Sequence, residues 1–329
     1  MPALLKRDAS KNVLILIVAL ILPVIFAGMG QTYPVLILCF AFLYMIATSG
    51  LDIVFGFCGQ ISMGHAAFFA IGAYGSAMLN KFFDIPVLLS MMIAAVLATV
   101  VGAIIAYPAS KLVFHFLSLA TIAFAEIVHS MLLISPGGIT GNAVGMFPKA
   151  ISLFGFQLNT NQRFYYFGLV CLALFLLFKY TLVNSKVGRA FIAIRENTHA
   201  AGGMGIDVTR YKVTAFAVSA FYTGFAGAMY AHLVRYIGPD TFTMKQSVMF
   251  VTMMLFGGTG SLAGPLVGAL LVLILNEGLR AFEQYQMLIY GILLLIVIVA
   301  IPGGVYGTAK KAVARLLEKK GGAHNAASR

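Results

Sequence analysis

The feature that most constrains this chain is a succession of apolar stretches, separated by short segments of charged and turn-forming residues. A helix that crosses a bilayer needs about 20 mostly apolar residues. Hydrophobic residues make up 61% of the 329 residues and charged residues only 10%, whereas soluble domains carry about a quarter charged residues. We therefore predict an all-α polytopic membrane protein with about ten transmembrane helices. The predicted helices lie at residues 13–30, 35–56, 62–79, 86–107, 113–134, 164–183, 212–233, 246–257, 262–281 and 286–303.

The two ends of the chain resemble familiar segments. The basic start followed by an apolar run resembles a signal peptide, but the run from Val13 to Met29 approaches the length of a bilayer span. We read it as an uncleaved first transmembrane helix. The prediction is one transmembrane domain over residues 1–307 and a basic tail over residues 308–329, whose first part could form a short interfacial helix.

The distribution of positive charge predicts the topology. With ten spans and the N-terminus inside, sixteen of the 22 Lys and Arg residues fall on the inner face, Lys179 among them. Cytoplasmic loops of membrane proteins collect Lys and Arg in this way. Both termini are therefore predicted to be cytoplasmic, and the net charge of +12 needs no nucleic-acid partner. The longest loop on the outer face is predicted at residues 135–163, where the apolar sequence ISLFGF could lie on the membrane or on a partner.

A long polar loop over residues 184–212 interrupts the apolar pattern. Val187, Ala190, Phe191 and Ile194 share one face of a predicted helix whose other face is polar. Thr198 could cap a second short helix, which Gly205 would end. A solvated loop is one reading, and a docking element for a cytoplasmic protein is the one we favour.

Two glycine-dense segments carry the pattern F-G-x-x-G, at residues 55–59 and 256–260. Glycine at membrane depth permits close helix packing, or it marks a broken helix that lines a substrate path. The helices at 62–79 and 246–257 are therefore expected to be broken or re-entrant. Polar residues at the first break, Gln60, Ser62 and His65, are candidates for lining a path. Neither segment is a P-loop, because no lysine follows Gly260.

Few ionisable groups fall inside the predicted spans. Glu126 lies three residues before His129, so the two share a helix face and could pair or line a path. Asp52 and Glu277 lie near span ends, where surface exposure is expected. The sequence contains no nucleophile–base–acid or metal-ligand pattern, and we predict neither an enzyme nor a cofactor.

Four ordered motifs together resemble the membrane-spanning permease subunits of bacterial branched-chain amino acid ABC importers, specifically the M-type of their two paralogous permeases. The likeness covers nearly the whole chain. The motifs are GLDIVFGFCGQISMGHAAFFAIGAYGSAML at residues 50–79, LATIAFAEIVHS at 119–130, GRAFIAIRENTHAAGGMGIDVTRYKVTAFAVSAFYTGFAGAMYA at 188–231 and FGGTGSLAGPLVGALLV at 256–272.

This resemblance implies a multi-pass protein of the bacterial inner membrane with several partners. They are a second paralogous permease subunit, two cytoplasmic ATPase subunits that hydrolyse ATP, and a periplasmic solute-binding protein facing residues 135–163. The resemblance places the coupling to the ATPase in the polar loop, at Arg189, Arg195, Glu196, Asn197 and Gly205. The candidates for the translocation path are Gln60, Ser62, His65, Thr121, Glu126 and Ser261.

The chain departs from the family pattern at several positions. Asp52 stands where Asn is common, His129 where Arg is frequent, and Gly202-Gly203 where Glu-Ala is usual. Relatives with the same motifs resemble transporters of urea, other amino acids, short amides or aromatic acids, so these solutes stay open beside branched-chain amino acids. A stand-alone secondary transporter is a weaker alternative, because it would leave the polar loop without a role.

Overall fold

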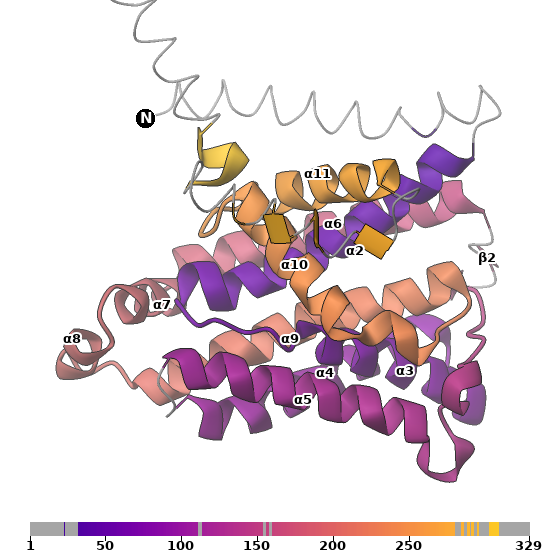
Figure 1. The fold of residues 1–329 in the computed structure, drawn as a ribbon, viewed down its shortest axis with the longest axis horizontal. Helices are drawn as coiled ribbons and strands as arrows, with labels where there is room; N and C mark the ends of the chain where they lie inside the picture. The colour runs from indigo at the N-terminus through magenta and orange to yellow at the C-terminus, as the bar shows by residue number, and fades with distance from the viewer. Residues whose placement is uncertain are drawn as a thin grey trace, which may run out of the picture.

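A computed structural model describes residues 32–110, 114–153, 156–157 and 160–279, together with position 23 and short stretches between residues 284 and 308. The predicted first span at 13–30, most of the last at 286–303 and nearly all of the basic tail lie outside the described residues. The long helices run roughly parallel or antiparallel as one bundle (Figure 1). Their bounds are α2 Tyr33–Asp52, α3 His65–Phe83, α4 Val87–Ala109, α5 Phe114–Ile134, α6 Asn161–Asn184, α9 Val208–Val234, α10 Met244–Gly257 and α11 Gly264–Gly278.

The remaining elements lie at the two ends of the bundle. The α7 end carries the short helices α7, Lys186–Glu196, and α8, Thr198–Gly203. The opposite end carries the 3₁₀ turns η2 (Pro136–Gly138), η3 (Asn142–Val144) and η4 (Pro239–Phe242), and a ribbon of two-residue strands, β1 (Ser152–Leu153) and β2 (Phe156–Gln157). The strands pair antiparallel, Ser152 with Gln157 and Leu153 with Phe156. The prediction of an all-α polytopic membrane protein is confirmed: among the described residues five helices are long and apolar enough to cross a membrane, and one shorter apolar helix, Gly264–Gly278, accompanies them.

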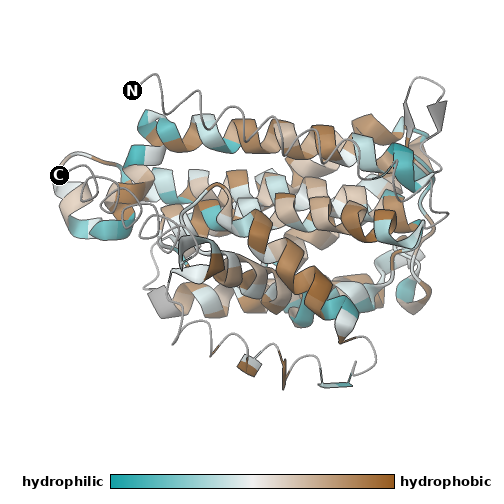
Figure 2. Cartoon of the chain, turned by 90° about the horizontal axis from the view of Figure 1, so that it is seen from above, coloured by the Kyte–Doolittle hydropathy of each residue, from teal (hydrophilic) through white to brown (hydrophobic). Residues whose placement is uncertain are grey.

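Hydropathy divides the bundle into an apolar middle and two more polar ends (Figure 2). Helices α4, α5 and α6 present large apolar side chains outward, including Ile104, Ile127 and Leu174, each more than half exposed. Exposing such large apolar surfaces to water is unfavourable. These three helices therefore contribute much of the described surface that faces an apolar environment.

Helix α9 occupies the centre of the bundle and packs against α2, α3 and α4. The contacts are close because small residues face one another. A Cβ atom at Gly72 of α3 would collide with the carbonyl oxygen of Gly224 of α9, and one at Gly227 would collide with that of Phe69. Small residues at helix interfaces allow backbones this near together in membranes, where packing rather than the hydrophobic effect holds helices together.

The helices expected to be broken, at 62–79 and 246–257, are continuous: α3 has 19 residues and α10 has 14, and the glycine-dense segments instead join successive helices. The α2 helix continues into one π-helical turn, η1 (Ile53–Phe57), and residues 59–64 are neither helix nor strand before α3 begins at His65. Helix α10 has only 14 residues, about 21 Å of rise, which is shorter than a bilayer core of about 30 Å. The loop at 258–263 then leads directly into α11.

Candidate functional site

Both glycine-dense breaks meet at the α7 end of the bundle. The amide N–H of Gly260 donates a 2.7 Å hydrogen bond to Oδ1 of Asp52, which ends α2. A Cβ atom at Gly56 would collide with both of these groups. The two F-G-x-x-G segments, about two hundred residues apart in sequence, are therefore in direct contact, and Gly56 allows that contact.

A buried ion pair joins a third helix to this junction. Nζ of Lys179, in α6, lies 2.9 Å from Oδ2 of Asp52, and both side chains are fully buried. Lys179 also donates to the carbonyl oxygen of Ser261 at 3.3 Å and lies 5.7 Å from the ring centroid of Phe57. Each carboxylate oxygen of Asp52 thus has a donor, as a buried charge requires.

These contacts correct one sequence prediction. Asp52 was expected near the surface; Lys179 was counted with the basic residues of the inner face, and that side is not tested by its burial. Both are inside the protein. The signal for the pair was present in the sequence, because Lys179 is a lone cation in the apolar run FLLFKYTLV and a buried cation needs a carboxylate.

The polar loop forms two capped helices, as predicted. Ser185 is the N-cap of α7, where its Oγ accepts from the backbone N–H of Val187 at 3.1 Å. Asn197 is the N-cap of α8, and its Oδ1 accepts from the N–H groups of His199 and Ala200 at 3.0 Å each. The predicted N-cap at Thr198 was wrong by one residue. Asn197 is the N-cap, and its side chain accepts from the two backbone N–H groups at the start of the helix.

Helix α7 has one buried face and one exposed face. Phe191 and Ile194 are buried, and the Phe191 ring lies edge-on to Tyr211 with centroids 6.3 Å apart. This confirms the predicted amphipathic helix. On the far side of the loop Met204 is 84% exposed, and Gly205 follows with a φ of +82°, a left-handed conformation that favours glycine.

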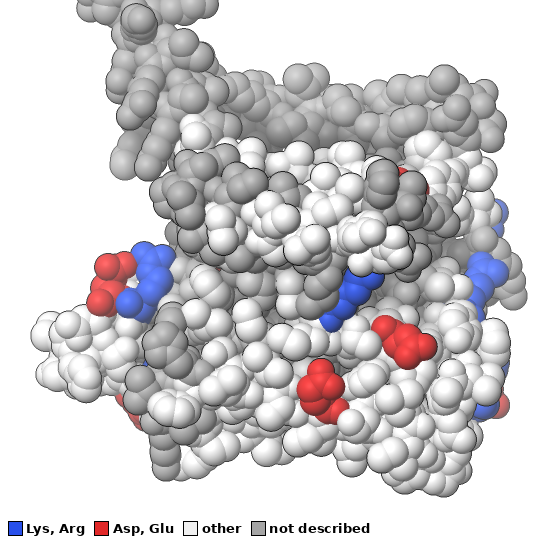
Figure 3. Space-filling model, in the orientation of Figure 1, with Lys and Arg blue, Asp and Glu red and all other residues white. Residues whose placement is uncertain are grey.

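Arg195 connects this surface helix to the broken α2 segment. Its Nη1 donates a 2.7 Å hydrogen bond to the carbonyl oxygen of Gly56, and its Nη2 lies 2.7 Å from Oε1 of Glu196. A Cβ atom at Gly59 would lie 2.7 Å from Cγ of Arg195. Arg189, by contrast, is exposed, and its side chain donates to the carbonyl oxygen of Asn184, at 3.4 Å. Acidic and basic side chains gather side by side at this end of the molecule (Figure 3).

Among the path candidates, Ser62, His65 and Thr121 are buried and hydrogen-bonded. His65 Nδ1 lies 3.1 Å from Ser62 Oγ, and Nε2 lies 2.7 Å from Ser219 Oγ of α9. Thr121 of α5 accepts from the N–H of Met63 at 3.0 Å. These side chains supply partners to a segment that has left helical geometry, as a membrane interior requires.

The remaining candidates lie in different places. Gln60 is buried, and its Oε1 has no hydrogen-bond partner among the described residues. Ser261 belongs to the junction, where its Oγ accepts from the N–H of Gly264 at 2.9 Å. Glu126 is exposed on α5 and forms no salt bridge within the described part of the chain, and Nε2 of its neighbour His129 also lacks a partner there. The structure therefore does not bring the six candidates into one cavity.

Comparison with known proteins gives the family. Residues 33–298 match the family described as "Branched-chain amino acid transport system / permease component". Two relatives are called high-affinity branched-chain amino acid transport system permease protein LivM. The one from Escherichia coli is 30% identical and the one from Salmonella typhimurium 29% identical, each over 89% of this chain and 75% of the relative. The probable branched-chain amino acid transport permease protein LivM of Methanocaldococcus jannaschii is 25% identical over 80% of this chain and 90% of its own.

No solved structure gives a significant match. The family match covers most of the chain, including both glycine-dense breaks, the junction and the polar loop. The chain therefore belongs to the family of permease components of branched-chain amino acid transport systems.

Proposed function

We propose that the chain is a transmembrane permease subunit of a binding-protein-dependent ABC importer. It would move branched-chain or related amino acids inward by alternating access, driven by ATP hydrolysis on partner subunits. The relatives' names support the solute class. The observation that carries the coupling mechanism is the hydrogen bond from Arg195, on an exposed helix, to Gly56, at the break of a membrane helix.

The α7 end is then the cytoplasmic end. Helices α7 and α8 would insert into an ATPase subunit, and both chain termini would lie on the same side in the bacterial inner membrane. The exposed residues Arg189, Glu196 and Met204 supply charge and apolar surface for that contact. Asn197 and Gly205 shape the element through their cap and left-handed turn. A methionine that is 84% exposed beyond the apolar bundle is better explained by a protein partner than by solvent.

The opposite end would face the periplasm and the solute-binding protein. There the loop over residues 135–163 is held to the bundle. Met146 and Ile237 exchange backbone hydrogen bonds of 2.9 Å each, and Lys149 pairs with Asp84 at 2.8 Å. Residues 135–151 of this loop therefore offer a defined surface.

The second permease subunit would contact α5. Glu126 is exposed on a helix long and apolar enough to cross a membrane. A carboxylate facing lipid near a helix centre is unfavourable by several kcal/mol. Its exposure in the isolated chain therefore favours a face that meets a protein partner or a water-filled path.

The Arg195–Gly56 contact can be tested separately from the surface that would bind the ATPase subunits. In the complex of both permeases and two ATPase subunits, Arg195→Ala should keep the ATPase subunits bound, because Arg189 and Met204 on the exposed surface are unchanged. It should lose most of the solute-driven transport, because the contact to Gly56 is gone. Met204→Asp should instead release the ATPase subunits. Lys81→Ala, an exposed cation at the opposite end, is the control.

Subunit stoichiometry after purification and uptake into proteoliposomes measure the two effects. Full transport by Arg195→Ala would refute the proposed coupling route. An unchanged ATPase stoichiometry in Met204→Asp would refute the proposed docking face.

A further inference from the structure

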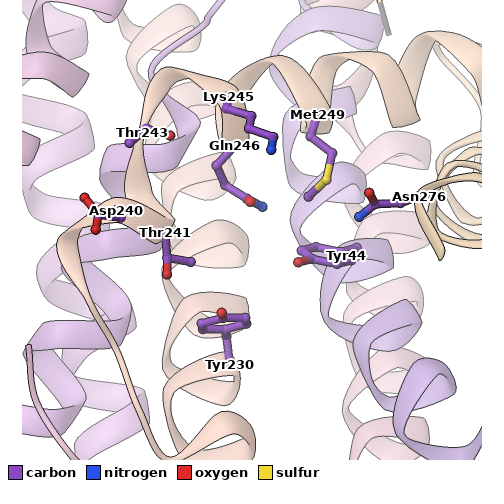
Figure 4. A pocket seen from close by; sticks show the side chains of 9 residues that line it. All are labelled: Tyr44, Tyr230, Asp240, Thr241, Thr243, Lys245, Gln246, Met249 and Asn276. Carbon is purple, nitrogen blue, oxygen red and sulfur yellow. The ribbon is translucent and has the colours of Figure 1, made fainter. Parts of the chain in front are cut away.

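A polar pocket of about 230 Å³ lies at the end of the bundle opposite α7, between α2, α9, η4, α10 and α11 (Figure 4). It is smaller than the roughly 300–1,000 Å³ typical of sites for drug-sized molecules, so it suits a small metabolite. The residues that line it are Tyr44, Tyr230, Asp240, Thr241, Thr243, Lys245, Gln246, Met249 and Asn276.

One buried group in this pocket lacks a partner. Gln246, in the first turn of α10, is only 9% exposed, and its Nε2 has no hydrogen-bond partner among the described residues. Figure 4 shows its amide extending into the space between α10 and the wall formed by Tyr44 and Asn276. A buried donor without a partner is unfavourable, and a ligand with an acceptor group would satisfy it.

The charges of the pocket balance. Lys245 extends from α10 beside Gln246, and Asp240 lies at the side of the pocket next to Thr241 (Figure 4). With one ammonium and one carboxylate, the described lining carries no net charge. This balance suits a zwitterion. A simple anion would place a second negative charge near the Asp240 carboxylate, and like charges at close range are unfavourable.

The remaining walls combine apolar surface with oxygen acceptors. Met249 and the ring of Tyr44 face one another across the space, and the ring of Tyr230 lies below them (Figure 4). Asn276, from α11, lies beside Tyr44 and carries a carbonyl oxygen that can accept a hydrogen bond. A ligand with a charged head and a compact apolar tail would use both kinds of surface.

We propose that this pocket binds one α-amino acid with an apolar side chain on its way through the permease. Lys245 and the Nε2 group of Gln246 would hold the α-carboxylate. The Asn276 oxygen would accept from the α-ammonium, while Asp240, on the opposite side of the pocket next to Thr241, balances the charge of Lys245. Tyr44 and Met249 would contact the side chain. This inference rests on the proposed transport function and adds a binding site to it.

Protection of a single cysteine tests the site in the assembled complex. Thr243 lines the pocket, is half-buried and makes no side-chain cap for α10, so Thr243→Cys reports on occupancy with little disturbance. The three native cysteines are buried and provide a low background. L-Leucine should slow modification by a methanethiosulfonate reagent at least about tenfold. 4-Methylpentanoate, which lacks the ammonium group, and 3-methylbutylamine, which lacks the carboxylate, should protect weakly.

Adding Lys245→Met or Gln246→Leu should raise the leucine concentration needed for protection about tenfold or more, the cost expected for losing a hydrogen bond to a charged group. Lys81→Met, at the same end but outside the pocket, should change nothing. Equal protection by 4-methylpentanoate would show a simple anion site and overturn the proposal, as would no protection by leucine. If Thr243→Cys fails to assemble, Thr241→Cys probes the same pocket from η4.

ATP hydrolysis stimulated by the binding protein is measured on the same preparation. If stimulation persists while leucine gives no protection, only the pocket assignment fails. If the chain neither assembles with ATPase subunits nor supports stimulated hydrolysis in its unaltered form, the proposed function itself fails.

Discussion

The buried pair of Asp52 and Lys179 allows a quantitative test of how the α7 end is held together. Both side chains are fully buried, and the pair joins α2 and α6 to the loop between α10 and α11 through Gly260 and Ser261. Removing one member of such a pair leaves an uncompensated charge and costs about 3–5 kcal/mol, whereas replacing both members is often nearly neutral. Because every 1.4 kcal/mol is tenfold, each single change should lower the folded-to-unfolded ratio by roughly a hundredfold to a few thousandfold.

The variants Asp52→Asn, Lys179→Met and the double change form a cycle. Asp52→Asn keeps an oxygen for the Gly260 N–H but leaves the Lys179 ammonium with only the Ser261 oxygen and the Phe57 ring. Lys179→Met leaves the carboxylate with only the backbone N–H donors of the 260–261 loop and no positive charge beside it. The double variant should recover most of the stability lost by either single variant, because neither uncompensated charge remains.

The exposed pair of Lys149 and Asp84 is the matched control. Its 2.8 Å contact is as short as the buried one, but the side chains are 64% and 83% exposed. Lys149 lowers the pKa of Asp84 through its hydrogen bond and charge, yet exposed pairs contribute little because water and salt screen them. Asp84→Asn should therefore unfold like the unaltered protein at pH 7.

Reversible unfolding of the purified chain in mixed micelles, followed by tyrosine fluorescence or circular dichroism, measures all five proteins. Two outcomes would refute the reasoning: single variants as stable as the unaltered protein, or a double variant whose loss equals the sum of the two single losses. Either outcome would mean that the pair is not a desolvated, mutually dependent contact.

Two glycine substitutions test the close backbone contacts. Gly56→Ala should destabilise the protein by about 1–3 kcal/mol, the usual cost of overpacking, because its Cβ would collide with Asp52 and Gly260. It should also reduce transport, because these residues lie beside the Arg195 contact. Normal stability and normal uptake would contradict the contact between the two glycine-dense segments. Gly72→Ala should weaken the α3–α9 packing by a similar amount in the same unfolding assay. Its control is Gly203→Ala, which meets nothing within 4 Å in α8 and should be neutral or slightly stabilising, since alanine favours helix by about 1 kcal/mol over glycine.

Much of the architecture followed from local pattern. The helix bounds agree with the prediction to within a few residues over the described spans, because an apolar segment of bilayer length can satisfy its backbone only as a helix. The two helices of the polar loop were also predictable, since the 3.6-residue period identifies the face that carries Phe191. The N-cap of α8 is Asn197 rather than Thr198. The sequence did not distinguish the two, because both residue types favour the N-cap position.

The partners of the polar groups were decided only by the tertiary structure. Asp52 and Lys179 are 127 residues apart, and Arg195 and Gly56 are 139 residues apart. Periodicity shows that a side chain faces inward but not which helix it meets, and several cations in this chain could have satisfied one carboxylate. The sequence by itself determined a membrane bundle of helices, with two glycine-dense segments near helix ends. The packing of α2 against α6, α9, α10 and α11 then decided that both glycine-dense segments and the buried ion pair would meet at one end, beside the surface helix α7.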